Sequence, residues 1–410
     1  MRRASLLALL AIAGSLFPLI ARAAEKPKVR AITAFVRIER PRFQAQVREA
    51  LGMLRKAKAA FEAAGYEVQT IRMATQPFPE YTRGLQPEEA LNFFRALDRL
   101  ATQENLTVAI GPAMLANEDD PRLVYFLGEI LQSTQALNGS VVVGGEDGVY
   151  WNAVRASAAL MKQLSETTPR SQGNFKFAAS AMLPTDTPFF PTAYHLGPGR
   201  QFAIGLESAH VVAEALATQR DPEPARQAVA TALGDHARTI ERVARVIVVE
   251  TGWQYLGIDL SPAPLKDASI AAAFEAFTGA RIGSPGSLTA ASIITQALRG
   301  IAVKQAGYNG LMLPVLEDSR LAQRWSEGAL KLDDLLAYSA VCGTGLDVVP
   351  LPGDITRQQL ERIIGDVATL AVRLRKPLSV RLLPVAGKKP GDRTDFDSPF
   401  LVNTVLQPLP

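Results

Sequence analysis

The sequence contains few of the residues that build common catalytic and metal sites. Among 410 residues there is one cysteine, Cys342, and there are three histidines. A single cysteine cannot form a disulfide within the chain, so a packed core has to supply the stability. The HExxH, paired CxxC and GxSxG patterns are missing as well. Their absence removes the usual zinc-enzyme and serine-hydrolase templates.

A strong excess of positive charge is also missing. The whole chain has 44 basic and 40 acidic residues, but three of the arginines are Arg2, Arg3 and Arg22. Without them the balance is 41 against 40, a net charge of +1. A nearly neutral chain without a basic stripe has no electrostatic reason to bind nucleic acid. We therefore expect no nucleic-acid partner.

The apolar run near the N-terminus is too short to span a membrane. It covers residues 6–20 and contains Pro18, whereas a membrane-spanning helix needs about 20 apolar residues. Arginines precede this run and a small-x-small signal ending at Ala23 follows it, a pattern typical of a cleaved signal peptide. We expect residues 1–23 to be removed and residues 24–410 to be periplasmic or secreted, without membrane insertion. Sec and twin-arginine export both stay open.

Alternating strand and helix patterns predict an α/β protein. Helical periodicity is expected at 43–64, from Pro87 onward, and at 151–163, 208–253 with a break at 221–224, 288–305 and 356–375. No linker, repeat or change in composition divides the chain, so we expect residues 24–410 to form a single domain. The expected strands are residues 29–36, 66–71, 106–110, 140–143, 255–260, 311–316, 378–383 and 401–406.

Polar residues cluster beside glycine and proline at the ends of the predicted strands. Loops at strand ends usually carry the sites of α/β folds. Converging carboxylates can bind a hard cation, or one can act as acid and another as base. We expect roughly half of the acids to cap turns or helices instead, as aspartate commonly does. The candidate acids are Asp259, Glu317, Asp318, Asp347, Asp354 and Asp392.

Five motifs around these residues resemble one protein family. They are PFFPTAYH, GIDLSPAP, GLMLPVLED, VCGTGLDVVPLPGD and KPLSVRLLPVAGK. They resemble domain of unknown function 711, related to uncharacterised protein family 0210, across residues 29–406. The resemblance implies a single-domain α/β barrel like that of pyruvate formate-lyase and the other glycyl radical enzymes, with no established reaction. The signal peptide and Ala386, where we expect proline, depart from the family pattern.

The barrel resemblance raises the question of what Cys342 does. Radical enzymes of that fold carry a cysteine on a loop inside the barrel, but the glycyl radical motif near the C-terminus is missing here. Radical chemistry is therefore disfavoured. A nucleophilic thiolate would need a nearby cation, and His195 is the candidate partner. The alternative is a small buried side chain beside Gly343 and Gly345, where a larger one would not fit.

Our leading hypothesis from the sequence is an exported enzyme that acts on a small polar or anionic metabolite by acid-base chemistry, such as a non-radical hydrolase or lyase. A non-catalytic periplasmic binding protein is the alternative. The cofactor and the oligomeric state stay open, with a divalent metal ion and a homo-oligomer among the options. The candidate catalytic residues are His195, Glu317, Asp318, Cys342 and Asp347, and the candidate substrate-binding residues are Asp259, Asp354, Arg381 and Asp392.

Overall fold

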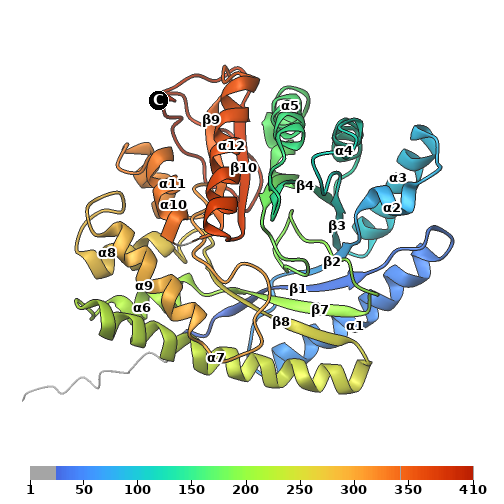
Figure 1. The fold of residues 1–410 in the computed structure, drawn as a ribbon. Helices are drawn as coiled ribbons and strands as arrows, with labels where there is room; N and C mark the ends of the chain where they lie inside the picture. Colours follow the sequence, from blue (N-terminus) through green and yellow to red (C-terminus); the bar gives the residue numbers. More distant parts are fainter. Residues whose placement is uncertain (1–24, 342, 410) are drawn as a thin grey trace, which may run out of the picture.

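The computed structural model describes residues 25–341 and 343–409, which form one curved sheet with helices outside it (Figure 1). The predicted signal peptide and Cys342 lie outside the described residues. The sheet has ten strands, nine of them in the order β8-β7-β1-β2-β3-β4-β6-β10-β9. The short strand β5 (Gly148–Val149) pairs with β4 alone.

The strands form two sets that run in opposite directions. The first set is parallel throughout and consists of β1 (Lys28–Val36), β2 (Ile71–Thr75), β3 (Thr107–Pro112), β4 (Leu137–Gly145) and β6 (Phe177–Ala181). The second set flanks it antiparallel on both sides, as β7 (Gln201–Glu207) with β8 (Gln254–Ala263), and β10 (Leu378–Val385) with β9 (Gly345–Pro352). The prediction of an α/β fold built on a barrel-like sheet is confirmed.

The segment of residues 305–318 lies between the two edge strands of the sheet. At its start Gln305 forms a parallel bridge with Ile258 of β8, and further on Pro314 forms one with Asp347 of β9. The two edge strands do not pair with each other in the described part of the chain. This irregular segment therefore takes the place of a strand in the gap between β8 and β9.

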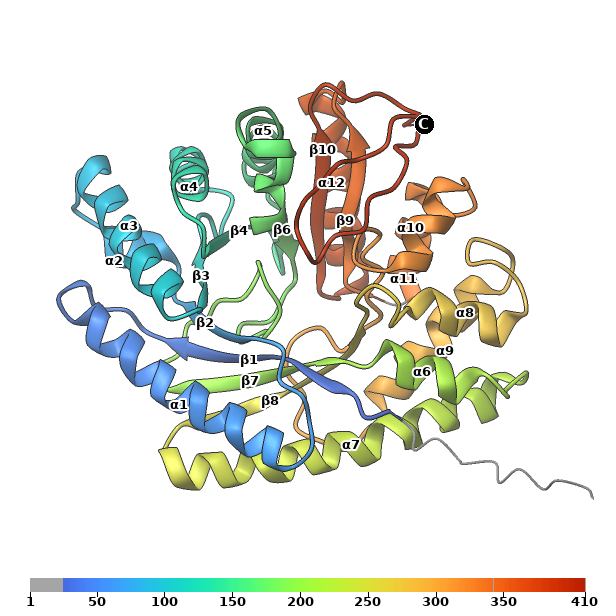
Figure 2. The ribbon, with the colours of Figure 1, turned by 180° about the vertical axis from the view of Figure 1, so that it is seen from behind.

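Amphipathic helices cover the outer face of the sheet. Apolar side chains from alternate strand positions, such as Ile32 and Met73, join one large core with the buried faces of these helices. Figure 2 shows α1 and α7 along the outside of β1, β7 and β8. The helices are α1 (Phe43–Ala63), α2 (Phe78–Thr82), α3 (Pro87–Gln103), α4 (Arg122–Ser133), α5 (Trp151–Thr167), α6 (Ala209–Leu216), α7 (Pro222–Thr251), α8 (Ile270–Thr278), α9 (Ser287–Arg299), α10 (Ser319–Ser326), α11 (Leu332–Val341) and α12 (Arg357–Leu374).

The inner face of the sheet carries smaller side chains because another part of the chain packs against it. Ala193 from the PFFPTAYH motif clusters with inward-facing residues of four strands, which are Phe35, Ala74, Ala109 and Ala203. Opposite Phe189, a Cβ atom added to Gly205 of β7 would lie 2.9 Å from the ring. The motif thus runs along the concave side of the sheet, with Phe189 near the first half of β1 and Ala193 beside Phe35 near its C-terminal end.

Several sequence predictions match the structure and others do not. The helix expected over residues 356–375 is α12, which begins with a capping box between Thr356 and Gln359. Residues 311–316 and 401–406 are not strands, and β2 starts at Ile71, where the predicted strand ended. The strands β6, β7 and β9 were not expected from the sequence. None of the helices within residues 25–341 and 343–409 is long and apolar enough to cross a membrane.

The start of β9 gives a test of this fold. Gly345 has φ +98°, and a Cβ atom there would meet the backbone carbonyl oxygen of Ser379 in β10. Gly387 has φ +77° with no atom within 4 Å of its Cβ position. An alanine at either position costs about 1–2 kcal/mol for its left-handed backbone. We expect Gly345→Ala to lower the free energy of unfolding by about 1–3 kcal/mol more than Gly387→Ala, because of overpacking. Urea denaturation measures both, and equal losses would contradict this β9–β10 register.

Candidate functional site

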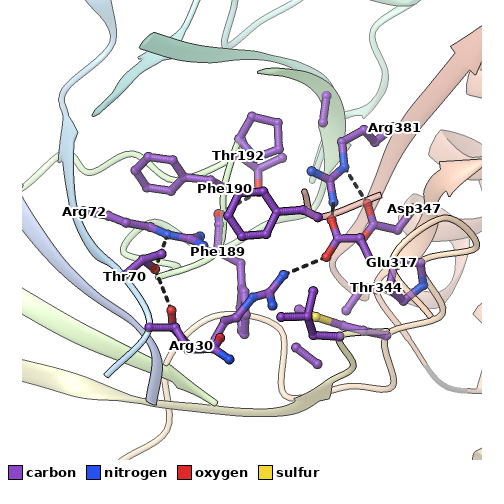
Figure 3. A pocket seen from close by; sticks show the side chains of 18 of the residues that line it. Arg30, Thr70, Arg72, Phe189, Phe190, Thr192, Glu317, Thr344, Asp347 and Arg381 are labelled. Atoms are coloured by element: carbon purple, nitrogen blue, oxygen red, sulfur yellow. Dashed lines mark hydrogen bonds and ion pairs between the residues drawn. The ribbon is translucent and has the colours of Figure 1, made fainter. Parts of the chain in front are cut away.

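A pocket of about 440 Å³ opens on the inner side of the sheet (Figure 3). Its lining includes residues near the N-terminal ends of β1 and β2, which are Arg30 and Arg72, and residues within β9 and β10, which are Asp347 and Arg381. Glu317 enters from the segment of residues 305–318. The pocket thus lies at the N-terminal ends of the parallel strands. Other α/β folds usually carry their sites at the C-terminal ends.

The carboxylate of Glu317 lies between two arginines. Arg30 Nη2 donates to Glu317 Oε2 at 2.8 Å, and Arg381 Nη2 donates to Glu317 Oε1 at 3.0 Å. All three residues are buried, with 6–8% of their surface exposed. A buried charge is tolerated when it is paired and hydrogen-bonded, and here both oxygens are bonded. Glu317 therefore connects β1, β10 and the segment of residues 305–318.

Two further carboxylates extend this arrangement into a chain of five charged groups. Arg30 Nη1 donates to Glu207 Oε2 at 3.2 Å, and Arg381 Nε donates to Asp347 Oδ1 at 2.7 Å. Burial alone would lower the pKa of Arg381, but Asp347 and Glu317 outweigh burial and raise it. Arg30 and Arg381 are thus each bonded to two carboxylates.

Arg72 is the third arginine of the pocket and it is bonded differently. Its Nε donates to Thr70 Oγ1 at 3.0 Å, and its guanidinium lies 5.1 Å from the centre of the Phe190 ring. No carboxylate of the described residues pairs with it. Burial and the neighbouring cations Arg30 and Arg381 lower the pKa of Arg72 to about 9. The group is therefore still charged at neutral pH and faces the pocket.

Neutral side chains complete the lining. The hydroxyl groups of Tyr308 and Thr192 are hydrogen-bonded at 2.9 Å. Burial raises the pKa of Tyr308 to about 12, so the phenol keeps its proton. Aromatic and aliphatic side chains form the remaining walls. One of them is Phe175, whose ring centre lies 4.9 Å from the Cζ atom of the Arg381 guanidinium. The apolar walls are Phe175, Phe189, Phe190, Leu265, Met312 and Phe400.

Only some of the residues proposed from the sequence reach this pocket. Glu317, Asp347 and Arg381 line it. Asp354 and Asp392 lie in exposed turns outside it. The proposed contact of Asp354 and Asp392 with a substrate in this pocket therefore has no geometric support. The grouping of Glu317 and Asp347 with Arg381 does have it.

Asp259 and Asp318 are buried and bind backbone amides instead. Asp259 accepts hydrogen bonds from the amides of Tyr308 and Asn309 at 2.7 and 3.1 Å, and burial raises the pKa of Asp259 to about 6. Asp318 caps α10 and also accepts from the amide of Ile270 at 2.7 Å. Both acids hold loops in place, which is the structural role expected for roughly half of the candidates.

His195 lies at the other end of β1. Its ring is 5.9 Å from Phe35, and its amide bonds the carbonyl of Thr75 at the end of β2. At about 3.3 Å per residue, Phe35 is roughly 16 Å along the strand from Arg30. The structure therefore does not bring His195 to Glu317, and the hypothesis that they share a proton loses its geometric support.

Three charged residues of the site, Arg30, Arg72 and Glu207, were not among the candidates from the sequence. The signal available was the one that singled out Arg381, a charged side chain inside or beside an apolar strand. A divalent metal ion was left open as a cofactor. Among the described residues no group of three or more His, Cys, Asp or Glu is placed to hold one. The pocket carboxylates Glu317 and Asp347 are bonded to arginines, and Glu67 at the rim pairs with Lys28.

Removal of the central charge should destabilise the protein. Glu317→Gln leaves two buried guanidinium groups without the carboxylate they share, and loss of one partner of a buried pair costs about 3–5 kcal/mol. The control is Glu67→Gln, because Glu67 is exposed and pairs with Lys28 at the pocket rim. We expect at most about 1 kcal/mol there. Equal unfolding free energies for the two variants would contradict a buried charge chain.

The buried imidazole of His195 predicts a pH dependence of stability. Burial lowers the pKa of His195, and it outweighs an opposing hydrogen bond to the backbone of Val36. The unfolded chain then binds a proton more readily, so stability is lost as pH falls below about 6.5. We expect wild type to lose more stability than His195→Phe between pH 7.5 and 5.5, in urea denaturation at each pH. The His210→Gln control should follow wild type, and parallel curves for wild type and His195→Phe would refute the assignment.

The family and relatives that match this sequence agree with the motifs. The chain is similar to a solved structure of an anaerobic ribonucleotide reductase, with a TM-score of 0.38 and 9% sequence identity. The match covers 92% of this chain and 74% of the reductase chain. A UPF0210 protein of Pyrobaculum aerophilum is 34% identical over 363 residues, covering 84% of this chain and 80% of the relative. A UPF0210 protein of Methanopyrus kandleri is 31% identical over 325 residues, which cover 75% of this chain and 72% of the relative. The family described as Uncharacterised ACR (DUF711) matches residues 22–397, so the chain belongs to this family.

Proposed function

We propose that this chain is an exported enzyme that binds a small anionic metabolite in the pocket and transfers a proton with Asp347. The observation that carries the proposal is the contrast between two kinds of charged group in one cavity. Glu317 is bonded to both Arg30 and Arg381, whereas the two terminal amino groups of Arg72 and the Oδ2 atom of Asp347 have no hydrogen-bond partner among the described residues. Export stays a prediction from the N-terminal sequence.

Asp347 is the best placed group for proton transfer. Its Oδ1 is held by Arg381 at 2.7 Å, while its side chain is 17% exposed and lies on the pocket wall. A general base needs one oxygen free to reach the substrate and a fixed orientation. The bond from Arg381 supplies the orientation and leaves Oδ2 available. Glu317 lacks that freedom because both of its oxygens accept from arginines.

Tyr308 supports the same chemistry as a neutral hydrogen-bond donor. With a pKa near 12 it stays protonated over the physiological range. Thr192 orients its hydroxyl from the PFFPTAYH motif. A substrate oxygen that gains negative charge during proton removal would be stabilised by such a donor. Arg72 would hold the anionic group of the substrate away from these residues, so that binding and proton transfer use separate side chains.

The test is turnover by a conservative variant. Wild-type protein is incubated with a metabolite mixture, and the depleted compound is identified by mass spectrometry. Asp347→Asn should lower its turnover by about 10²–10⁴-fold, the usual contribution of general acid-base catalysis. Asp366→Asn makes the same change on the exposed face of α12 and should leave turnover unchanged. Full activity of Asp347→Asn would refute the role of Asp347, and a retained compound recovered unchanged would favour the binding-protein alternative.

A further inference from the structure

We propose that the ligand is a monocarboxylate with an apolar body, and that its carboxylate binds the terminal amino groups of Arg72. This inference rests on the proposed function in that it concerns the same pocket, and it narrows the ligand class from small anions in general. It follows from how Arg72 is oriented, from which cations of the pocket are already bonded, and from the character of the walls.

Arg72 is oriented before any ligand arrives. Its Nε donates to Thr70 Oγ1 at 3.0 Å, and Thr70 Oγ1 in turn donates to the carbonyl oxygen of Arg30 at 2.6 Å. The Phe190 ring lies against the guanidinium at 5.1 Å from its centre. Only Nη1 and Nη2 are left without a hydrogen-bond partner among the described residues. Two parallel N–H groups in one plane match the two oxygens of a carboxylate, which they can bind as a bidentate pair.

The other two arginines are not free to bind a second negative charge. Arg30 is bonded to Glu207 and Glu317, and Arg381 is bonded to Glu317 and Asp347. Together with Arg72, these groups balance three positive charges against three negative ones. A dianion such as a phosphate monoester would bring two negative charges to one available arginine. A monoanion adds one negative charge to this balanced set and pairs that charge with Arg72, whereas the second charge of a dianion would find no free arginine.

The walls select the rest of the ligand. Phe175, Phe190 and Met312 line the pocket, and Phe400 stacks on Phe175 with ring centres 6.5 Å apart. These surfaces suit an aromatic or branched aliphatic body, because they bury apolar area without demanding hydrogen bonds. Figure 3 shows Arg72 on one side of the cavity and the Glu317, Asp347 and Arg381 group on the other. An apolar body would lie between them.

Three probes of similar shape and different charge test the inference without any variant. They are phenylacetate, which is a monoanion, phenylacetamide, which is neutral, and phenyl phosphate, which is a dianion at pH 8. Binding to the wild-type chain is measured by isothermal titration calorimetry. We expect phenylacetate to bind at least tenfold more tightly than either of the other two. Tighter binding of phenyl phosphate or phenylacetamide, or no measurable binding of phenylacetate, would overturn the proposal.

A pair of variants then places the carboxylate. Arg72→Gln should weaken phenylacetate binding at least tenfold and leave phenylacetamide binding unchanged. The control is Arg37→Gln, because Arg37 is exposed, pairs with Glu80 and lies outside the pocket. Arg72→Lys keeps the positive charge but loses the two parallel N–H groups, so its affinity for phenylacetate should lie between those of wild type and Arg72→Gln. It also serves as a second variant in case the glutamine variant misfolds. Unchanged phenylacetate binding in both Arg72 variants would overturn the assignment.

These outcomes separate the ligand class from the proposed function. Asp347→Asn should still bind phenylacetate, because the carboxylate of phenylacetate contacts Arg72 and not Asp347. If that variant also kept full turnover, the proton-transfer role of Asp347 would fall while the ligand class stood. If phenyl phosphate bound more tightly but Asp347→Asn abolished turnover, the ligand class would fall while the enzyme proposal stood.

Discussion

The ion pairs of Glu317 with Arg30 and Arg381 are the constraint on which the site depends. Each of these groups is almost fully removed from water, and an unpaired buried charge is far more costly than a paired one. Arg30 and Arg381 belong to strands on opposite sides of β6, and Glu317 belongs to the segment between β8 and β9. Arg30 and Arg381 therefore gain their shared carboxylate only when this segment is in place between β8 and β9. The same segment thus fills the gap in the sheet and completes the pocket.

Small inward-facing side chains make room for this arrangement. Segments that pack against the curved sheet approach it closely, as Phe189 does at Gly205 of β7, and as Gly307 of the segment of residues 305–318 does at the side chain of Asp259 in β8. Aspartates that bind backbone amides hold these segments in position. A closed barrel packed only with side chains from its strands would leave less space for a ligand. Here the interior is filled at the His195 end and left open at the end where Arg30 lies.

Much of the fold could be predicted from the sequence because long elements carry a clear period. The helix α7 and the strands β8 and β10 match closely. The strand β6 was missed because Phe177 is its one large apolar residue among Ala and Ser. The strand β7 was missed although Phe202, Ile204 and Leu206 stand at alternate positions. Residues 311–316 and 401–406 were predicted as strands for their apolar content. Leu316, Leu401 and Leu406 instead pack together in a separate small core without a ladder.

The site was harder to predict, since sheet register decides which charged side chains meet. The acids were found because they stand in unusual motifs, but motif position does not tell an acid that binds arginine from one that binds backbone amides. Arg30 and Arg72 lie 42 positions apart in sequence and become neighbours only because β1 and β2 pair in parallel with Ile32 opposite Ile71. Since one strand carries Arg30 already bonded to two carboxylates and the next carries Arg72 with none, the sheet places a satisfied cation beside an unsatisfied one. That asymmetry makes Arg72 the natural anchor for an incoming anion.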